Sequence, residues 1–224
     1  MKKNFKKKAF TLIEISIVLV IIGIILASVM KGRDLIKGSQ IKEFNQVFVS
    51  QWETIANSYF SRMANVLGDG EINGGTAGEE PDGFMDGEDS NTTLQALTDS
   101  GIEVTELIKS DLNDPFYRTV DGEMAGKCRV KIGFCYYKIN GKSKNALVFM
   151  NIPNDIAQAI DTIRDGQPDG TKGSVLAVQT KGTSGDDSVE HTLWDAGSTI
   201  TPVEWNDIPS NTRYVKHMLV ILEH

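Results

Sequence analysis

The residues best suited to chemistry lie in an acidic loop in the first half of the chain. Calcium binds six to eight oxygen ligands, and its twelve-residue loop follows the pattern D-x-[DN]-x-[DN]-G-x5-E. The residues at positions one, three, five, six and twelve of such a pattern are Asp69, Glu71, Asn73, Gly74 and Glu80. Glu71 is longer than the usual ligand, and Pro81 follows directly, which argues against a regular exit helix. The pattern predicts a calcium loop that is attached to one helix at most.

The whole acidic loop is much richer in carboxylates than this pattern requires. It contains no basic residue, and its eight acids are Asp69, Glu71, Glu79, Glu80, Asp82, Asp86, Glu88 and Asp89. A second and weaker calcium pattern is Asp165-x-Gln167-x-Asp169-Gly170, which lacks an acid at position twelve. Both stretches could instead be solvated acidic loops, because Asp, Asn and Gly are common turn residues. Where calcium binds, we expect it to order a loop that otherwise repels itself. No other cofactor is expected.

Catalytic motifs are absent from the sequence. There is no G-x-S-x-G, no H-E-x-x-H and no phosphate-binding loop. The three histidines, His191, His217 and His224, are far apart in the chain, and each is expected to be a surface or strand residue. We therefore expect a protein that is not an enzyme.

The chain has two cysteines, Cys128 and Cys135, with six residues between them. The segment that holds them is typical of a tight β-hairpin or a looped strand. A cysteine pair outside the cytoplasm usually forms a disulfide, and no nearby histidine or third cysteine completes a zinc set. We predict a disulfide between these residues, with two buried thiols as the alternative.

The elements that must position these groups begin at the N-terminus. A leader with five lysines ends at Ala9, and an apolar run from Phe10 to Met30 follows, with Glu14 as its only charged residue. As a helix this run is about 31 Å long, which is enough to cross a bilayer. A secretory signal peptide has a shorter apolar region, and a signal anchor has no need of Glu14. The lysines favour a cytoplasmic leader, with the rest of the chain outside the cytoplasm.

This start resembles the class III leader of type IV prepilins and of the related pseudopilins of type II secretion. Their motif is a short basic leader, a cut before Phe, then T-L-[IV]-E and an apolar helix, and Phe10–Glu14 match it position by position. The resemblance implies cleavage between Ala9 and Phe10 by a prepilin peptidase, followed by N-methylation of the new Phe10 amine. One difference is that the family usually has Gly before the cut, where this chain has Ala9.

Glu14 is expected to serve assembly. A carboxylate within a membrane helix is costly and requires a partner. Cleavage would create an α-amino group four residues before it, with a reference pKa of about 7.7–8. Among staggered identical helices, the amine of one subunit can meet Glu14 of its neighbour and set the axial register.

The charge of the chain limits its partners. The formal net charge is −7, and removing the five leader lysines takes it to −12. An acidic chain argues against general nucleic-acid binding.

A one-sided apolar pattern follows the apolar run. Apolar residues recur three or four positions apart, which is typical of an amphipathic helix. Because no Pro precedes Pro81, we predict one helix from about Thr11 to Leu67, ended by Gly68. The stripe consists of Ile41, Phe44, Phe48, Trp52, Ile55, Tyr59, Met63 and Val66.

The remaining chain is expected to form an α+β head with an antiparallel β-sheet on the long helix. Short helices are predicted over Thr92–Ser100 and Asp155–Arg164, and Trp194 and Trp205 could be core or contact aromatics. The predicted strands are Arg129–Ile132, Phe134–Ile139, Ala146–Asn151, Ser174–Thr180 and Tyr214–Leu222. The resulting parts are a cleaved leader (1–9), a transmembrane or fibre-core half-helix (10–30), an amphipathic half-helix (31–67) and the head (68–224).

The resemblance implies a structural subunit of a type IV pilus-like filament, as a homo-oligomer or assembled with other pilins. Its partners would be the prepilin peptidase and methyltransferase, an inner-membrane assembly platform and an ATPase. The expected location is the inner membrane, crossed once, with the head in the periplasm or outside the cell. Two alternatives are a type II secretion pseudopilin and an extracytoplasmic binding or adhesion module at a pilus tip.

Overall fold

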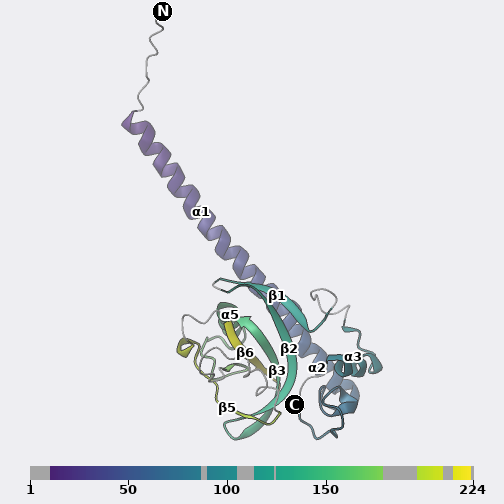
Figure 1. Cartoon of the computed structure of the whole chain (residues 1–224). Coiled ribbons are helices and arrows are strands. Elements are labelled where there is room, and N and C mark those ends of the chain that lie inside the picture. The colour runs from purple at the N-terminus through teal and green to yellow at the C-terminus, as the bar shows by residue number, and fades with distance from the viewer. Residues whose placement is uncertain are drawn as a thin grey trace, which may run out of the picture. The chain divides into compact units, whose positions relative to one another are not determined.

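The computed structural model of the chain describes residues 11–86, 90–104, 114–123, 125–178, 196–208 and 214–222 (Figure 1). It consists of two compact units, with the boundary between Gln40 and Ile41. The predicted cleavage site lies outside the described residues. So do the following residues, on which predictions also rest: Glu88, Asp89, His191, Trp194 and His224.

Most of helix α1 (Leu12–Phe44) makes up the first unit. Every large apolar side chain from Leu12 to Met30 is between 46 % and 92 % exposed. Among the described residues, one helical stretch, Leu12–Met63, is long and apolar enough to cross a membrane. The long apolar helix that the sequence predicted is therefore confirmed.

The helical chain continues into the second unit through a π-helical turn, η1 (Asn45–Val49), and then α2 (Ser50–Met63). The predicted stripe is buried from Ile41 to Tyr59, and each of its side chains there is at most 8 % exposed. A one-sided apolar pattern thus packs within the chain, as predicted.

The helix ends earlier than predicted. Ala64 adopts a left-handed conformation with a φ of 55°, so α2 stops at Met63 instead of continuing to about Leu67. Met63 is 44 % exposed and does not belong to the buried stripe. Val66 and Leu67 are buried, but from the segment after the helix, because the left-handed turn redirects the chain toward the core.

Six described strands form one sheet in the order β1-β2-β3-β6-β4, with β5 beside β2. All pairs are antiparallel except the short β2–β5 pair, so the predicted antiparallel sheet is confirmed. The strands are β1 (Tyr117–Gly122), β2 (Gly126–Ile139), β3 (Lys142–Pro153), β4 (Val175–Val178), β5 (Thr199–Ile200) and β6 (Tyr214–Ile221).

Helices α3 (Ser90–Asp99) and α5 (Asn154–Asp165) correspond to the two predicted short helices. Gly166, which has a φ of 82°, ends α5. Ile163, near the end of α5, is 46 % exposed. The described part of the chain also holds the 3₁₀ turns η2 (Glu71–Asn73) and η4 (Trp205–Asp207).

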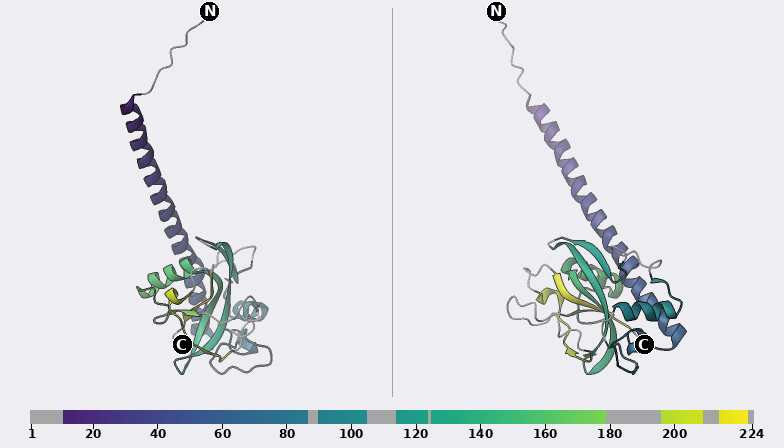
Figure 2. Two further views of the ribbon diagram at one scale, coloured as in Figure 1. Left: turned by 60° about the vertical axis from the view of Figure 1, so that its left-hand side comes forward. Right: turned by 45° about the vertical axis from the view of Figure 1, so that its right-hand side comes forward.

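The sheet separates two apolar clusters. One face packs against α2 and α5 (Figure 2), with Trp52 stacked on Phe116 at 5.1 Å between ring centroids and edge-on to Phe134 at 5.5 Å. The opposite face carries a second cluster that includes Tyr137. Trp205 is 1 % exposed, so this tryptophan belongs to the core.

The predicted disulfide is wrong. Cys128 and Cys135 are both thiols on β2, which is one continuous strand instead of a hairpin. Seven positions of extended chain span about 23 Å, and bridged cysteines need Cα atoms within about 7 Å. The odd spacing also places them on opposite faces of the sheet, with Cys135 buried in the second cluster.

Candidate functional site

The start of α1 is fixed by the residues of the N-terminal motif. Thr11 precedes the helix, and Glu14 Oε2 accepts hydrogen bonds from the Thr11 backbone N–H and from Thr11 Oγ1, both at 2.8 Å. The Glu14 backbone N–H in turn donates to Thr11 Oγ1 at 3.3 Å. This is a capping box, in which the first residue and the third helical residue satisfy each other's polar groups. The T-x-x-E spacing is the sequence signal that could have predicted it.

The capping box leaves part of Glu14 available. Both hydrogen bonds go to Oε2, and no described residue donates to Oε1. The same carboxylate can therefore cap its own helix and accept a bond from another chain.

The exposed apolar helix needs a cover that the described part of the chain does not provide. Burying a large apolar side chain stabilises by about 1.5–3 kcal/mol, and contiguous exposed apolar surface of this extent marks a membrane or protein interface. The helix can be covered by lipid or by other helices of the same kind.

The first acidic loop does not bring the predicted calcium set together. Asn73 is buried, its Oδ1 accepts from the Tyr59 hydroxyl at 2.9 Å, and its Nδ2 donates to the Asp69 carbonyl. Glu71 Oε2 accepts from the Gly78 N–H, and Glu80 is exposed. Calcium binding in this loop remains a prediction, but residues other than the predicted set would have to supply the ligands.

A different group of acids converges instead. One carboxylate oxygen from each of Asp69, Asp82 and Asp86 lies within 4.8 Å of the others. Asp69 is 2 % exposed, and its two oxygens accept from the backbone N–H groups of Asp82 and Gly83, both at 2.8 Å. Asp82 and Asp86 belong to the acidic loop but lie outside the calcium pattern in the sequence, because that pattern assumes a regular helix-loop path.

Charge accumulates in this cluster. Burial raises the pKa of the Asp86 carboxyl, and the nearby charges of Asp69, Asp82 and Glu79 act in the same direction. A hydrogen bond from the Gly70 N–H opposes them. The cluster is therefore a candidate cation site in which most oxygens already accept backbone hydrogen bonds.

The second acidic loop also holds its carboxylates through the backbone. Asp165 accepts hydrogen bonds from Ser174 and Val175, whereas Asp169 Oδ1 accepts from the N–H groups of Thr171 and Lys172. The residue that joins Asp165 is Asp161, which the sequence pattern did not include. Its only sequence signal is the four-residue spacing, which places both on one side of a helix.

Of the three histidines, the structure describes His217. It is 5 % exposed and lies on strand β6, as expected for a strand residue.

Comparison with known proteins identifies the N-terminal motif. Residues 4–30 match the family described as the prokaryotic N-terminal methylation motif. No curated protein and no solved structure matches the chain. The match supports a type IV pilin-like or pseudopilin-like protein in general, and its family is structural and not enzymatic. The chain thus carries the class III prepilin-type motif of type IV pilins and pseudopilins.

Proposed function

We propose that this chain is a structural subunit of a type IV pilus-like filament that polymerises through its N-terminal helix. A prepilin peptidase would cut between Ala9 and Phe10, and the new Phe10 amine would be methylated. The observation that carries the proposal is the apolar helix from Leu12 to Met30, which is exposed along its whole length and lies within the residues that match the methylation motif.

In this proposal the subunit is stored in the inner membrane with its head outside the cytoplasm. An assembly platform and an ATPase then move it into the filament, where copies of the helix, or helices of other pilins, replace lipid. The free energy of a large apolar side chain changes little when it moves from lipid to a contact with other helices, because both surroundings are apolar. Specific polar contacts must therefore set the register.

Glu14 supplies that contact. Its Oε2 stays with Thr11, while Oε1 accepts a bond from the Phe10 amine of the adjacent subunit. An ion pair in apolar surroundings stabilises only where both partners are well aligned, which makes it a device for register more than for strength.

Two Glu14 variants test this function in cells. Glu14→Val removes both the cap and the charge, whereas Glu14→Gln keeps a capping acceptor and removes only the charge. We expect both to be cleaved normally, as read from the size shift on an immunoblot. We expect cells with either variant to lose the surface filaments that shearing releases. Thr11→Ala is the matched variant, because it loses the cap but keeps the charge. Normal filament yield in Glu14→Gln would refute the register role of the charge.

A type II secretion pseudopilin is the second reading of the same motif. A deletion strain separates the two, because loss of surface fibres supports the pilin and loss of exoprotein secretion supports the pseudopilin. If fibres persist in normal number but lose binding to a surface, a tip-displayed adhesion module is favoured. The acidic head gives no reason to expect general nucleic-acid binding.

A further inference from the structure

Two acidic side chains on α5, the buried Asp161 and the half-buried Asp165, form a pair outside the N-terminal motif. Asp161 and Asp165 are four residues apart, which places them on one side of the helix. Asp161 is 0 % exposed, and its Oδ2 accepts hydrogen bonds from Trp205 Nε1 at 2.5 Å and from the Gly170 N–H at 3.0 Å. Its other oxygen, Oδ1, is buried and accepts no hydrogen bond from any described donor.

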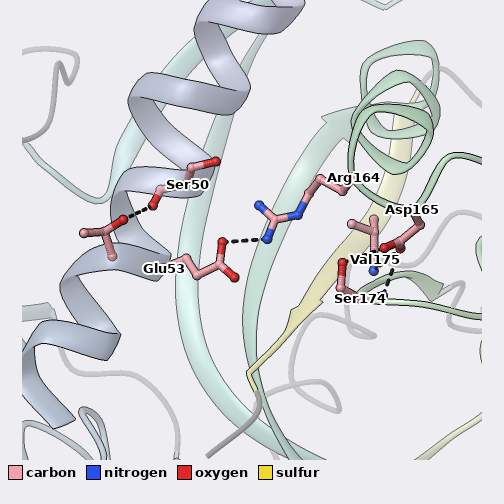
Figure 3. A network of polar contacts seen from close by, with 7 residues as sticks. Ser50, Glu53, Arg164, Asp165, Ser174 and Val175 are labelled. Atoms are coloured by element: carbon pink, nitrogen blue, oxygen red, sulfur yellow. Dashed lines mark hydrogen bonds and ion pairs between the residues drawn. The ribbon is translucent and has the colours of Figure 1, made fainter. Parts of the chain in front are cut away.

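Asp165, the second member of the pair, also accepts hydrogen bonds through both of its oxygens. Its Oδ2 accepts from the N–H groups of Ser174 at 2.9 Å and Val175 at 2.8 Å, and its Oδ1 accepts from Ser174 Oγ at 2.8 Å (Figure 3). The Asp161 side chain lies within hydrogen-bonding reach of this carboxylate. Two carboxylates are both acceptors, so their contact is favourable only when a proton or a cation joins them.

No basic side chain among the described residues neutralises the pair. Arg164 is adjacent in sequence, but it turns toward Glu53 on α2 and forms an ion pair with it at 2.5 Å (Figure 3). The other groups that donate to the pair, such as the Trp205 indole and the Ser174 hydroxyl, are neutral. A buried carboxylate such as that of Asp161 is strongly destabilising when it is charged and has no positive partner.

The two carboxyls differ in their readiness to lose a proton. Burial raises the pKa of Asp161, and the charges of Asp165 and Asp169 add to this effect. For Asp165, burial acts in the same direction, but hydrogen bonds from Val175 and Ser174 outweigh it and lower its pKa. Asp165 therefore gives up its proton more readily than Asp161.

Solvent can reach the Asp165 side of the pair. Asp165, Gly173 and Ser174 line a cavity of about 660 Å³, which extends to Phe84 and Lys144. Lys144 forms no ion pair with Asp165. A Cβ on Gly173 would come within 2.3 Å of Asp165 Oδ2, so only glycine lets the loop pass this close to the carboxylate.

We propose that Asp161 and Asp165 bind a divalent cation, with Ca²⁺ the best match, which enters through this cavity. Oδ1 of Asp161 and Oδ1 of Asp165 are the protein ligands, Ser174 Oγ is a third oxygen beside them, and water completes the shell. Hard oxygen ligands in irregular geometry suit Ca²⁺ better than Mg²⁺, which requires a near-octahedral site. The proposal does not depend on polymerisation.

Terbium luminescence tests this site, because Tb³⁺ replaces Ca²⁺ and Trp205 can sensitise it. The full-length protein in detergent is treated with EGTA, titrated with Tb³⁺ under tryptophan excitation, and then competed with Ca²⁺. We expect saturable emission that Ca²⁺ displaces. We expect Asp161→Asn and Asp165→Asn each to weaken Ca²⁺ binding at least tenfold. Asp82→Asn, which makes the same charge change in the first acidic loop, should leave the emission unchanged.

Melting of the wild-type protein provides a test that needs no variant to fold. Addition of Ca²⁺ to EGTA-treated protein should raise the Tm at pH 7. If Ca²⁺ has no effect while acidification raises the Tm, a proton joins the carboxyls and the proposal is overturned. Loss of emission in Asp82→Asn with full emission in folded Asp161→Asn would also overturn it, because the ion would then bind the first loop.

Discussion

The helical chain contains two stretches of similar apolar residues, one exposed and one buried. From Leu12 to Met30 the large apolar side chains are at least 46 % exposed, whereas the stripe from Ile41 to Tyr59 is at most 8 % exposed. The first stretch is apolar on every side, and the second is apolar on one side only. An apolar stripe is covered by the chain's own sheet, but an apolar cylinder requires an external cover. The comparison therefore separates the part that folds the head from the part that anchors or assembles it.

The largest effect is expected on the buried side of this comparison. Trp52→Ala removes a fully buried ring that contacts Phe116 and Phe134 and should lower the free energy of unfolding by about 3–5 kcal/mol. Circular dichroism melting of the full-length protein in detergent measures it. Met63→Ala, a truncation of a half-exposed residue on the same helix, is the control and should change stability by less than about 0.5 kcal/mol.

A substitution in the exposed stretch should weaken membrane insertion and leave the melting of the head unchanged. Ile21→Lys places a charge within the apolar run and should weaken membrane insertion by about 2.5–3.5 kcal/mol. Extraction by alkaline carbonate measures membrane retention, with Ile21→Leu as the control. The melting of the head should stay the same, because Ile21 is 51 % exposed and lies in the first unit. A drop in Tm comparable to that of Trp52→Ala would contradict the separation of the two units.

A smaller effect on stability, which depends on pH, is expected from Tyr137 in the second apolar cluster. Burial raises the pKa of Tyr137 above its ordinary value, and Cys135 adds to the shift. The folded state therefore keeps this proton when the unfolded chain has lost it. The stabilisation is complete below about pH 10 and is lost as pH rises further, by up to about 1.4 kcal/mol per pH unit. Alkaline melting curves of wild type and Tyr137→Phe should diverge in this range, and parallel curves would show that Tyr137 is not the group responsible.

The smallest effect lies at the tip of the exposed helix. Thr11→Ala removes the capping hydroxyl and should destabilise the first turn of α1 by about 1 kcal/mol. Hydrogen exchange of the first helical amides in micelles measures this, and Thr11→Ser should retain the protection. Ser16→Ala, whose hydroxyl donates to the Ile13 carbonyl, should have little effect on the cap.

Local patterns were reliable where a single element decides the outcome. The apolar run, the stripe to Tyr59, helix α5 and the antiparallel sheet all follow from local patterns such as periodicity. The end of α2 could not be predicted in this way, since Ala64 takes the left-handed turn that glycine usually takes. Strand β2 was predicted as two pieces, Arg129–Ile132 and Phe134–Ile139, but continuous pairing with β3 makes them one strand.

The sequence alone determined how the chain starts: an N-terminal motif, a capped helix and an apolar surface too long for one domain to cover. It could do so because these properties depend on neighbours within one or two helical turns. Only the tertiary structure decided which polar groups meet. Cys128 and Cys135 are held apart on one continuous strand, whereas Asp161 is buried beneath Trp205, which lies 44 residues later in the chain. Contacts of this kind depend on long-range packing, which no spacing in the sequence records.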